Sequence, residues 1–150
     1  MPKTDGSEIR RLASVPSANG IVLSPDHKRL FVCSGKQIVS FDVAGVGRLA
    51  LGAEGTAKSQ VFGAIETGIF DSMAAEADGG LVAATSIVGA LTVFAPDGKT
   101  RGTIPLPPET FVTNMGFGGR DLEVAYVTLT QTGKLVALDW PRKGLRLVNQ

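Results

Sequence analysis

Residues 71–94 read DSMAAEADGGLVAATSIVGALTVF. The stretch opens on an acid, and an Asp-Gly-Gly turn at 78–80 leads into the apolar run Leu81–Thr85. A turn marked by Gly89 then leads into a second apolar run, Leu91–Phe94. Short apolar runs that are rich in Val, Leu and Thr and bounded by glycine indicate strands rather than helices. The stretch therefore predicts short strands joined by tight turns.

The same order of features occurs twice more, from Asn19 to Asp42 and from Asn114 to Asp139. Each unit has a polar residue, an inner strand, a polar turn, a second strand, a Gly-marked turn and a third strand that ends near an acid. The opening residues Asn19, Asp71 and Asn114 are 52 and 43 residues apart. These spacings are close to the roughly 40–45 residues of a four-stranded propeller blade. The chain therefore looks like a row of repeated blades.

We predict an all-β chain that folds as a partial β-propeller of about three four-stranded blades plus an outer-strand remnant. The expected blades cover 18–68, 69–112 and 113–150, and residues 1–17 are expected to be the remnant of a preceding blade. The outer strands are predicted at Ile9–Ala13, Val61–Phe62 and Thr103–Ile104. The other predicted strands are Leu30–Cys33, Ile38–Val43, Leu81–Thr85, Leu91–Phe94, Val124–Thr128 and Leu135–Leu138. Several are apolar on both faces, as expected where sheets stack face to face.

The composition argues against several classes of protein. Of the 150 residues, 43% are hydrophobic and 19% are charged, which argues against intrinsic disorder. The 15 basic and 14 acidic residues give a net charge of +1, without the basic excess expected of a nucleic-acid-binding domain. No apolar run approaches the roughly 18 residues of a membrane span, so a cytoplasmic location without membrane contact is expected. Cys33 is the only cysteine, which excludes an intrachain disulfide, and its apolar neighbours predict a small buried residue.

Four segments carry a resemblance to a known family. They are 18–26 (ANGIVLSPD), Asp71-Ser72-Met73 followed by Asp78-Gly79-Gly80-Leu81, 113–119 (TNMGFGG) and 138–147 (LDWPRKGLRL). In this order they resemble the senescence-marker-protein (regucalcin)/gluconolactonase family. The resemblance covers nearly the whole chain but only about the C-terminal half of the family's six-bladed propeller.

The resemblance implies a metal-dependent lactonase or related esterase with one divalent cation at the mouth of the central tunnel. The family holds this cation with a Glu from its first blade, an Asn and an Asp. The Asn corresponds to Asn19 and the Asp to Asp71, which is also the expected catalytic residue. The family's Glu has no counterpart here, so the chain alone is expected to bind the cation weakly. Ca²⁺ is the ion expected first, with Mg²⁺, Mn²⁺ and Zn²⁺ as alternatives.

The residue types support such a site without the resemblance. Inner strands of successive blades begin around one axis, so their first polar side chains can converge there. Carboxylate and amide oxygens suit hard cations, which can polarise an ester carbonyl while a carboxylate such as Asp71 accepts a proton. Asn114 opens the third unit and is predicted to line the pocket or hydrogen-bond the substrate.

Purely structural interpretations are also open for these residues. Asn19-Gly20 is a type I′ turn signal, and Asp71 could close a turn or cap a short helix. His27 is expected at a solvated turn, and Trp140 is expected to pack against the last blade. The basic cluster Arg142, Lys143 and Arg146 is expected to be a solvated tail.

The chain is therefore predicted to hydrolyse a small sugar lactone or an ester once its ring is completed. Three origins of a half ring are open: a truncated six-blade gene, which is expected first, a separate N-terminal half, or a homodimer that closes the ring. The alternative is a non-catalytic propeller-type module that binds protein through its open blade faces, or an inactive fragment.

Overall fold

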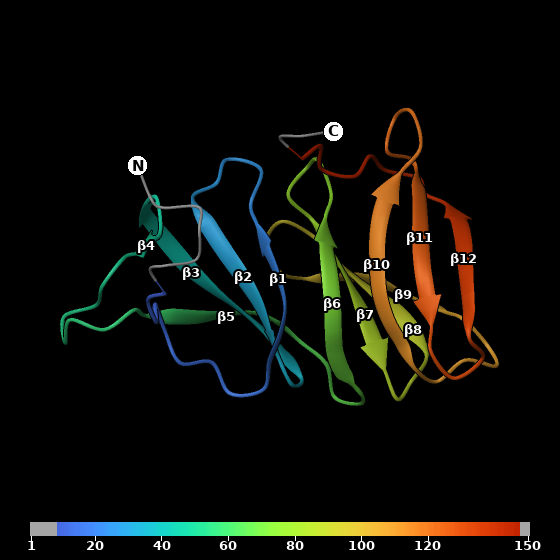
Figure 1. The fold of residues 1–150 in the computed structure, drawn as a ribbon, viewed down its shortest axis with the longest axis horizontal. Coiled ribbons are helices and arrows are strands. Elements are labelled where there is room, and N and C mark those ends of the chain that lie inside the picture. The colour runs from blue at the N-terminus through green and yellow to red at the C-terminus, as the bar shows by residue number, and fades with distance from the viewer. Residues whose placement is uncertain (1–8, 148–150) are drawn as a thin grey trace.

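The computed structural model describes residues 9–147, and this part of the chain contains strands but no helix. The strands form three antiparallel sheets that stand next to one another like the blades of an open fan (Figure 1). Residues 9–147 accordingly hold no helix that is long and apolar enough to cross a membrane.

Each sheet is built from strands that follow one another in the sequence. The first contains β1 (Ala18–Leu23), β2 (Arg29–Ser34), β3 (Gln37–Gly45) and β5 (Ser59–Ala64), and the short β4 (Arg48–Leu49) also pairs with β3. The second contains β6 (Ile69–Ala75), β7 (Leu81–Ser86), β8 (Ala90–Phe94) and β9 (Thr100–Pro105). The third contains β10 (Val112–Gly118), β11 (Val124–Leu129) and β12 (Lys134–Asp139). The predicted all-β partial propeller is confirmed.

The third sheet differs from the other two at its outer edge. β5 and β9 provide the outer strands of the first two sheets, at the predicted positions. Within the described residues, the third sheet ends at β12 and has three strands instead of the predicted four.

The first strands of the three sheets, β1, β6 and β10, lie side by side (Figure 1). β6 is the middle one and contacts both of its neighbours. We call these three the hub strands. Because each one opens a sheet, the residues near their starts come close together although they are far apart in the sequence.

Apolar side chains fill the two boundaries between the sheets. At the first boundary, the rings of Phe31 and Phe62 pack edge to face with centroids 4.8 Å apart, and those of Phe70 and Phe94 do so at 5.7 Å. Such pairs add about 0.5–1.5 kcal/mol to the free energy of burial itself. The second sheet has neighbours on both sides, so every residue of β7 and β8 is buried. This confirms the prediction of strands that are apolar on both faces.

The outer face of the first sheet is partly covered by the segment that precedes it. Val32, Phe41 and Leu49 are buried there, and Ala13 and Val15 pack against them. The predicted outer strand at Ile9–Ala13 was wrong, because residues 9–15 form no strand. A strand requires backbone hydrogen bonds to a neighbouring strand, and these residues cover the sheet with side chains instead. Residues 1–8 of the expected remnant lie outside the described part.

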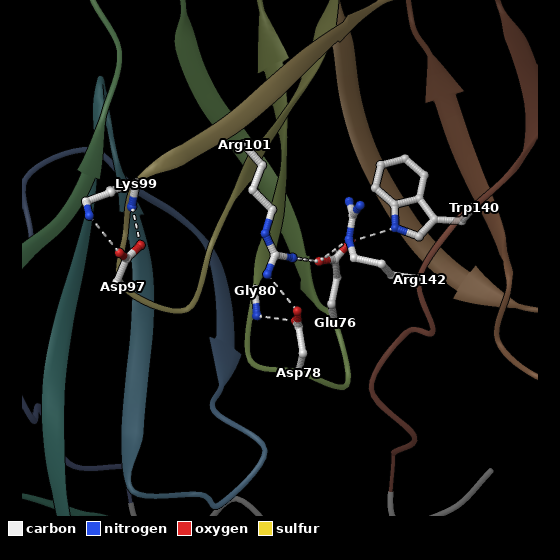
Figure 2. A network of polar contacts seen from close by, with 8 residues as sticks. All are labelled: Glu76, Asp78, Gly80, Asp97, Lys99, Arg101, Trp140 and Arg142. Atoms are coloured by element: carbon white, nitrogen blue, oxygen red, sulfur yellow. Dashed lines mark hydrogen bonds and ion pairs between the residues drawn. The ribbon is translucent and has the colours of Figure 1, made fainter.

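A buried carboxylate ties the second sheet to the end of the described chain (Figure 2). Glu76 follows β6 and has no exposed surface. It accepts hydrogen bonds from the Trp140 indole Nε1 at 2.7 Å, the Arg142 Nε at 2.8 Å and the Arg101 Nη1 at 2.8 Å. Arg101 also donates to Asp78 at 2.7 Å. Burying a carboxylate without such partners would be strongly unfavourable, so this network specifies where these segments meet.

The segment 140–147 continues from this network along the end of β6. Leu145 N donates to the Ala75 carbonyl at 2.9 Å, and Ala77 N donates to the Lys143 carbonyl at 2.8 Å. Trp140 is buried against the third sheet, as predicted. The prediction of a solvated basic tail was wrong for Arg142, which pairs with Glu76 at long range in the sequence.

Glu76→Ala should lower the free energy of unfolding by about 3 kcal/mol, because it leaves two guanidinium groups and an indole N–H without their shared acceptor. Urea unfolding measures the loss. The matched control is Glu66→Ala, at an exposed position, which should change the free energy by less than about 0.5 kcal/mol. Equal losses in the two variants would contradict the role assigned to Glu76.

Candidate functional site

A β-bulge interrupts β1 at the residues predicted to open the site. Ala18 pairs with Ser34 and Ile21 with Val32, so Asn19 and Gly20 together lie opposite the single residue Cys33. A bulge adds one residue to one strand, bends it and changes the direction of the side chain that it carries.

The other two hub strands carry bulges at the corresponding place. In β6, Phe70 pairs with Thr85 and Met73 with Ala83, so Asp71 and Ser72 lie opposite one residue. In β10, the register shifts between Val112 and Asn114. Bulges are frequent next to functional sites. The bulges of β1, β6 and β10 lie at corresponding places in the three sheets, so their residues can be compared position by position.

Gly20 allows β1 and β6 to approach each other at this level. A Cβ atom on Gly20 would lie 2.6 Å from the carbonyl oxygen of Asp71 and 2.8 Å from the Cα of Ser72. Both distances are shorter than a side-chain carbon tolerates, and the contacts are to backbone, which cannot move aside. The backbones of the two bulges are therefore in direct contact, and residues 19 and 71 belong to one site region.

The environment of Cys33 gives independent evidence for the position of the Asp71 side chain. Burial raises the pKa of the Cys33 thiol to about 12, the nearby Asp71 carboxylate adds to this rise, and a hydrogen bond from the Gly20 backbone partly opposes it. The carboxylate of β6 thus lies close to the β1–β2 pair. Cys33 remains a protonated, buried thiol at neutral pH, in agreement with its predicted packing role.

Asn114 does not occupy the position equivalent to Asp71. Met73 and Met115 pair with corresponding residues of β7 and β11, and Asp71 lies two residues before Met73 whereas Asn114 lies one residue before Met115. The place of Asp71 is therefore taken by Thr113, and the predicted equivalence was wrong by one position. The bulges cause this difference, because the sequence does not show where the extra residue falls. Asn114 is exposed, and its Oδ1 accepts the Met115 N–H at 2.8 Å.

The donors in the β1 and β6 bulges fit part of a hard-cation site. The Asn19 amide oxygen and the Asp71 carboxylate are ligands that Ca²⁺ and Mg²⁺ accept. Asn19 is exposed and Asp71 is half-buried, so both are reachable from solvent. Among residues 9–147 no group of three or more His, Cys, Asp or Glu side chains is placed to hold a metal ion. Within this part of the chain, the β1 and β6 bulges thus offer two suitable oxygen donors.

Three other acidic residues have structural roles in turns. The carboxylate of each one accepts the backbone N–H two residues further on, which is the usual Asx-turn contact. The pairs are Asp26 with Lys28 at 3.1 Å, Asp78 with Gly80 at 2.8 Å and Asp97 with Lys99 at 3.0 Å. His27 lies in the first of these turns with a φ of 57° and is exposed, as predicted.

A groove of about 670 Å³ runs along the hub strands, between them and the segment 140–147. Ser72 lines it from the bulge in the middle of β6, Asn114 from β10 and Leu145 from the segment that follows the third sheet. We call this cavity the hub groove. It reaches the β6 bulge through Ser72, and neither Asn19 nor Asp71 lines it.

Sequence reasoning missed Glu76 and the three bulges. In the sequence, Glu76 is visible only as an acid within the Ala-rich stretch 74–77, at the end of the first strand of the second unit. Its partners Arg101 and Arg142 lie 25 and 66 residues away, so nothing local identified the network.

The pattern of the SMP-30/Gluconolactonase/LRE-like region matches residues 3–131 of the sequence. The chain belongs to this family. The predicted resemblance is thereby confirmed. A comparison with curated protein sequences gave no match.

Solved structures of members of this family and related proteins show the same fold. A gluconolactonase from Xanthomonas campestris is 25% identical with a TM-score of 0.74, and the match covers 92% of this chain and 42% of that one. A calcium-binding regucalcin from Agrobacterium tumefaciens is 22% identical with a TM-score of 0.72, covering 90% of this chain and 50% of that one. The chain thus spans half or less of the length of these relatives.

Gly20→Ala should destabilise the protein by about 1–3 kcal/mol, because the added carbon must push the β1 and β6 backbones apart. Gly102→Ala is the matched control, since a Cβ there meets nothing within 4 Å. Both are measured by urea unfolding. A Gly20→Ala variant as stable as the control would contradict the close approach of the two bulges.

Proposed function

We propose that this chain is a metal-dependent hydrolase of a lactone or ester, of the gluconolactonase type, with its reaction centre at the bulges of β1 and β6. The backbone contact at Gly20 supports the proposal, since it places side by side two bulges that carry an amide and a carboxylate 52 residues apart in the sequence. Family membership supports a lactonase-type reaction.

In this proposal Asn19 and Asp71 hold one divalent cation, with Ca²⁺ expected first and Mg²⁺, Mn²⁺ or Zn²⁺ as alternatives. When bound, the cation supplies Lewis-acid polarisation of the substrate carbonyl. The regucalcin to which the chain is similar is described as calcium-binding, which favours a hard ion. Two protein ligands hold Ca²⁺ weakly, so millimolar affinity is expected of the isolated chain.

Asp71 is also the proposed general base of the reaction. Its carboxylate takes a proton from water as the water oxygen forms a bond to the carbonyl carbon. The carbon–oxygen bond to the leaving alkoxide then breaks, and the alkoxide takes up a proton to give a hydroxy acid from a lactone, or an acid and an alcohol from an ester. Asn114 is proposed to donate a hydrogen bond to the substrate from the wall of the hub groove, which it lines.

The site is proposed to be completed by further blades, from a second copy of the chain or from an N-terminal half. Beside the first sheet, Leu12 is 43% and Val46 83% exposed, which is an apolar surface suited to another blade. In a two-fold ring, each copy would contribute its own Asn19 and Asp71. The mass in solution tests this step: a dimer of the 15.6 kDa chain supports self-completion, and a monomer contradicts it.

The same apolar face favours a second candidate function, a non-catalytic module that binds another protein. In that case Asn19 and Asp71 would tolerate substitution, while a charge placed at Val46 would abolish association.

Asp71→Asn should weaken Ca²⁺ binding at least about tenfold and abolish lactone hydrolysis, because it removes the only ionised ligand and the base. Millimolar Ca²⁺ should raise the unfolding temperature of the parent protein by about 2–5 °C but not that of the variant. Calorimetric titration measures Ca²⁺ binding, and a pH-stat assay with glucono-δ-lactone measures hydrolysis.

Asp42→Asn is the matched control, since Asp42 is an exposed acid on β3 of the first sheet. This variant should leave Ca²⁺ binding and lactone hydrolysis unchanged. No response of the parent protein to Ca²⁺, Mg²⁺, Mn²⁺ or Zn²⁺, or equal responses of the two variants, would contradict the proposed site.

A further inference from the structure

The hub groove is apolar along most of its length. Ile21 and Leu23 line it from β1, Met115 and Phe117 from β10, and Leu145 from the last described segment. Its volume of about 670 Å³ lies within the roughly 300–1,000 Å³ of small-molecule sites. A sugar ring would leave its hydroxyl groups without hydrogen-bond partners along such a wall, which is unfavourable.

The polar side chains of the groove are separated into two groups. Ser72 lies in the β6 bulge and Asn114 at the β10 bulge, whereas His27 follows the end of β1 and Arg146 belongs to the last described segment. A ligand that fits this order has a polar reacting group at the bulges and a hydrocarbon part along the groove.

We propose that the hub groove binds the hydrocarbon chain of an alkyl lactone or acyl ester whose carbonyl lies at Asn19 and Asp71. This inference rests on the proposed function and narrows its substrate class. It is argued from the place where the groove ends, because Ser72 lines the groove and belongs to the same bulge as Asp71. Each methylene that leaves water against these side chains strengthens binding.

Gly116 offers a direct way to fill the groove. It lies on β10, lines the groove, and has nothing within 4 Å of an added Cβ. Gly116→Leu therefore starts a side chain in open space at the groove wall, where it competes with the hydrocarbon chain. Gly102 on β9 is equally open and does not line the groove, so Gly102→Leu is the matched control.

The experiment compares γ-butyrolactone with γ-decalactone by calorimetric titration of the full chain. Affinity should rise about twofold to fourfold for each of the added carbons, so that γ-decalactone binds at least about sixtyfold more tightly. Gly116→Leu should remove most of this preference, and Gly102→Leu should retain it. Equal affinities for the two lactones, or an unchanged preference in Gly116→Leu, would overturn the proposal.

Hydrolysis of the same lactones separates this inference from the proposed function. A chain preference in binding without hydrolysis supports the groove and contradicts the hydrolase. Hydrolysis of γ-butyrolactone or glucono-δ-lactone without any chain preference supports the hydrolase and overturns the groove. A change in solution mass in Gly116→Leu with no effect on lactone binding would make the groove an interface between copies and would also overturn the proposal.

Discussion

The close approach of β1 and β6 at Gly20 is the contact on which the site depends. A side chain at this position would collide with the Asp71 carbonyl, so the two bulged strands meet backbone to backbone. This contact brings together the bulge that carries Asn19 and the bulge that carries Asp71. Without it, the two bulges would be separated by the width of an intervening side chain.

The packing of the sheets makes this contact possible. Each sheet buries an apolar face against its neighbour, and only the second sheet is covered on both sides by other sheets. The Glu76 network then joins the second sheet to Trp140 and Arg142, next to the segment that borders the hub groove. β6 is thus held at its end by buried polar contacts, and the hub strands pack along their length through apolar side chains.

Most of the fold could be predicted from the sequence because its signals are local. The apolar runs of β7 and β8 and the glycine turns between them identify the second blade, and its repetition identifies the other two. The repeat also predicts the corresponding positions of Asn19 and Asp71, which each open the bulge of their strand. The register at Asn114 did not, because a bulge inserts a residue without a sequence signal. Glu76 and the course of residues 9–15 depend on partners distant in the sequence.

Amide line broadening by Mn²⁺ in a ¹⁵N-labelled sample tests most directly whether the β1 and β6 bulges form a single cation site. We expect the strongest broadening at residues 19–21 and 71–73 and at Cys33, all at the same low Mn²⁺ concentration. Broadening centred on the turns at Asp26, Asp78 and Asp97, with residues 19 and 71 unaffected or responding at different concentrations, would contradict a shared site.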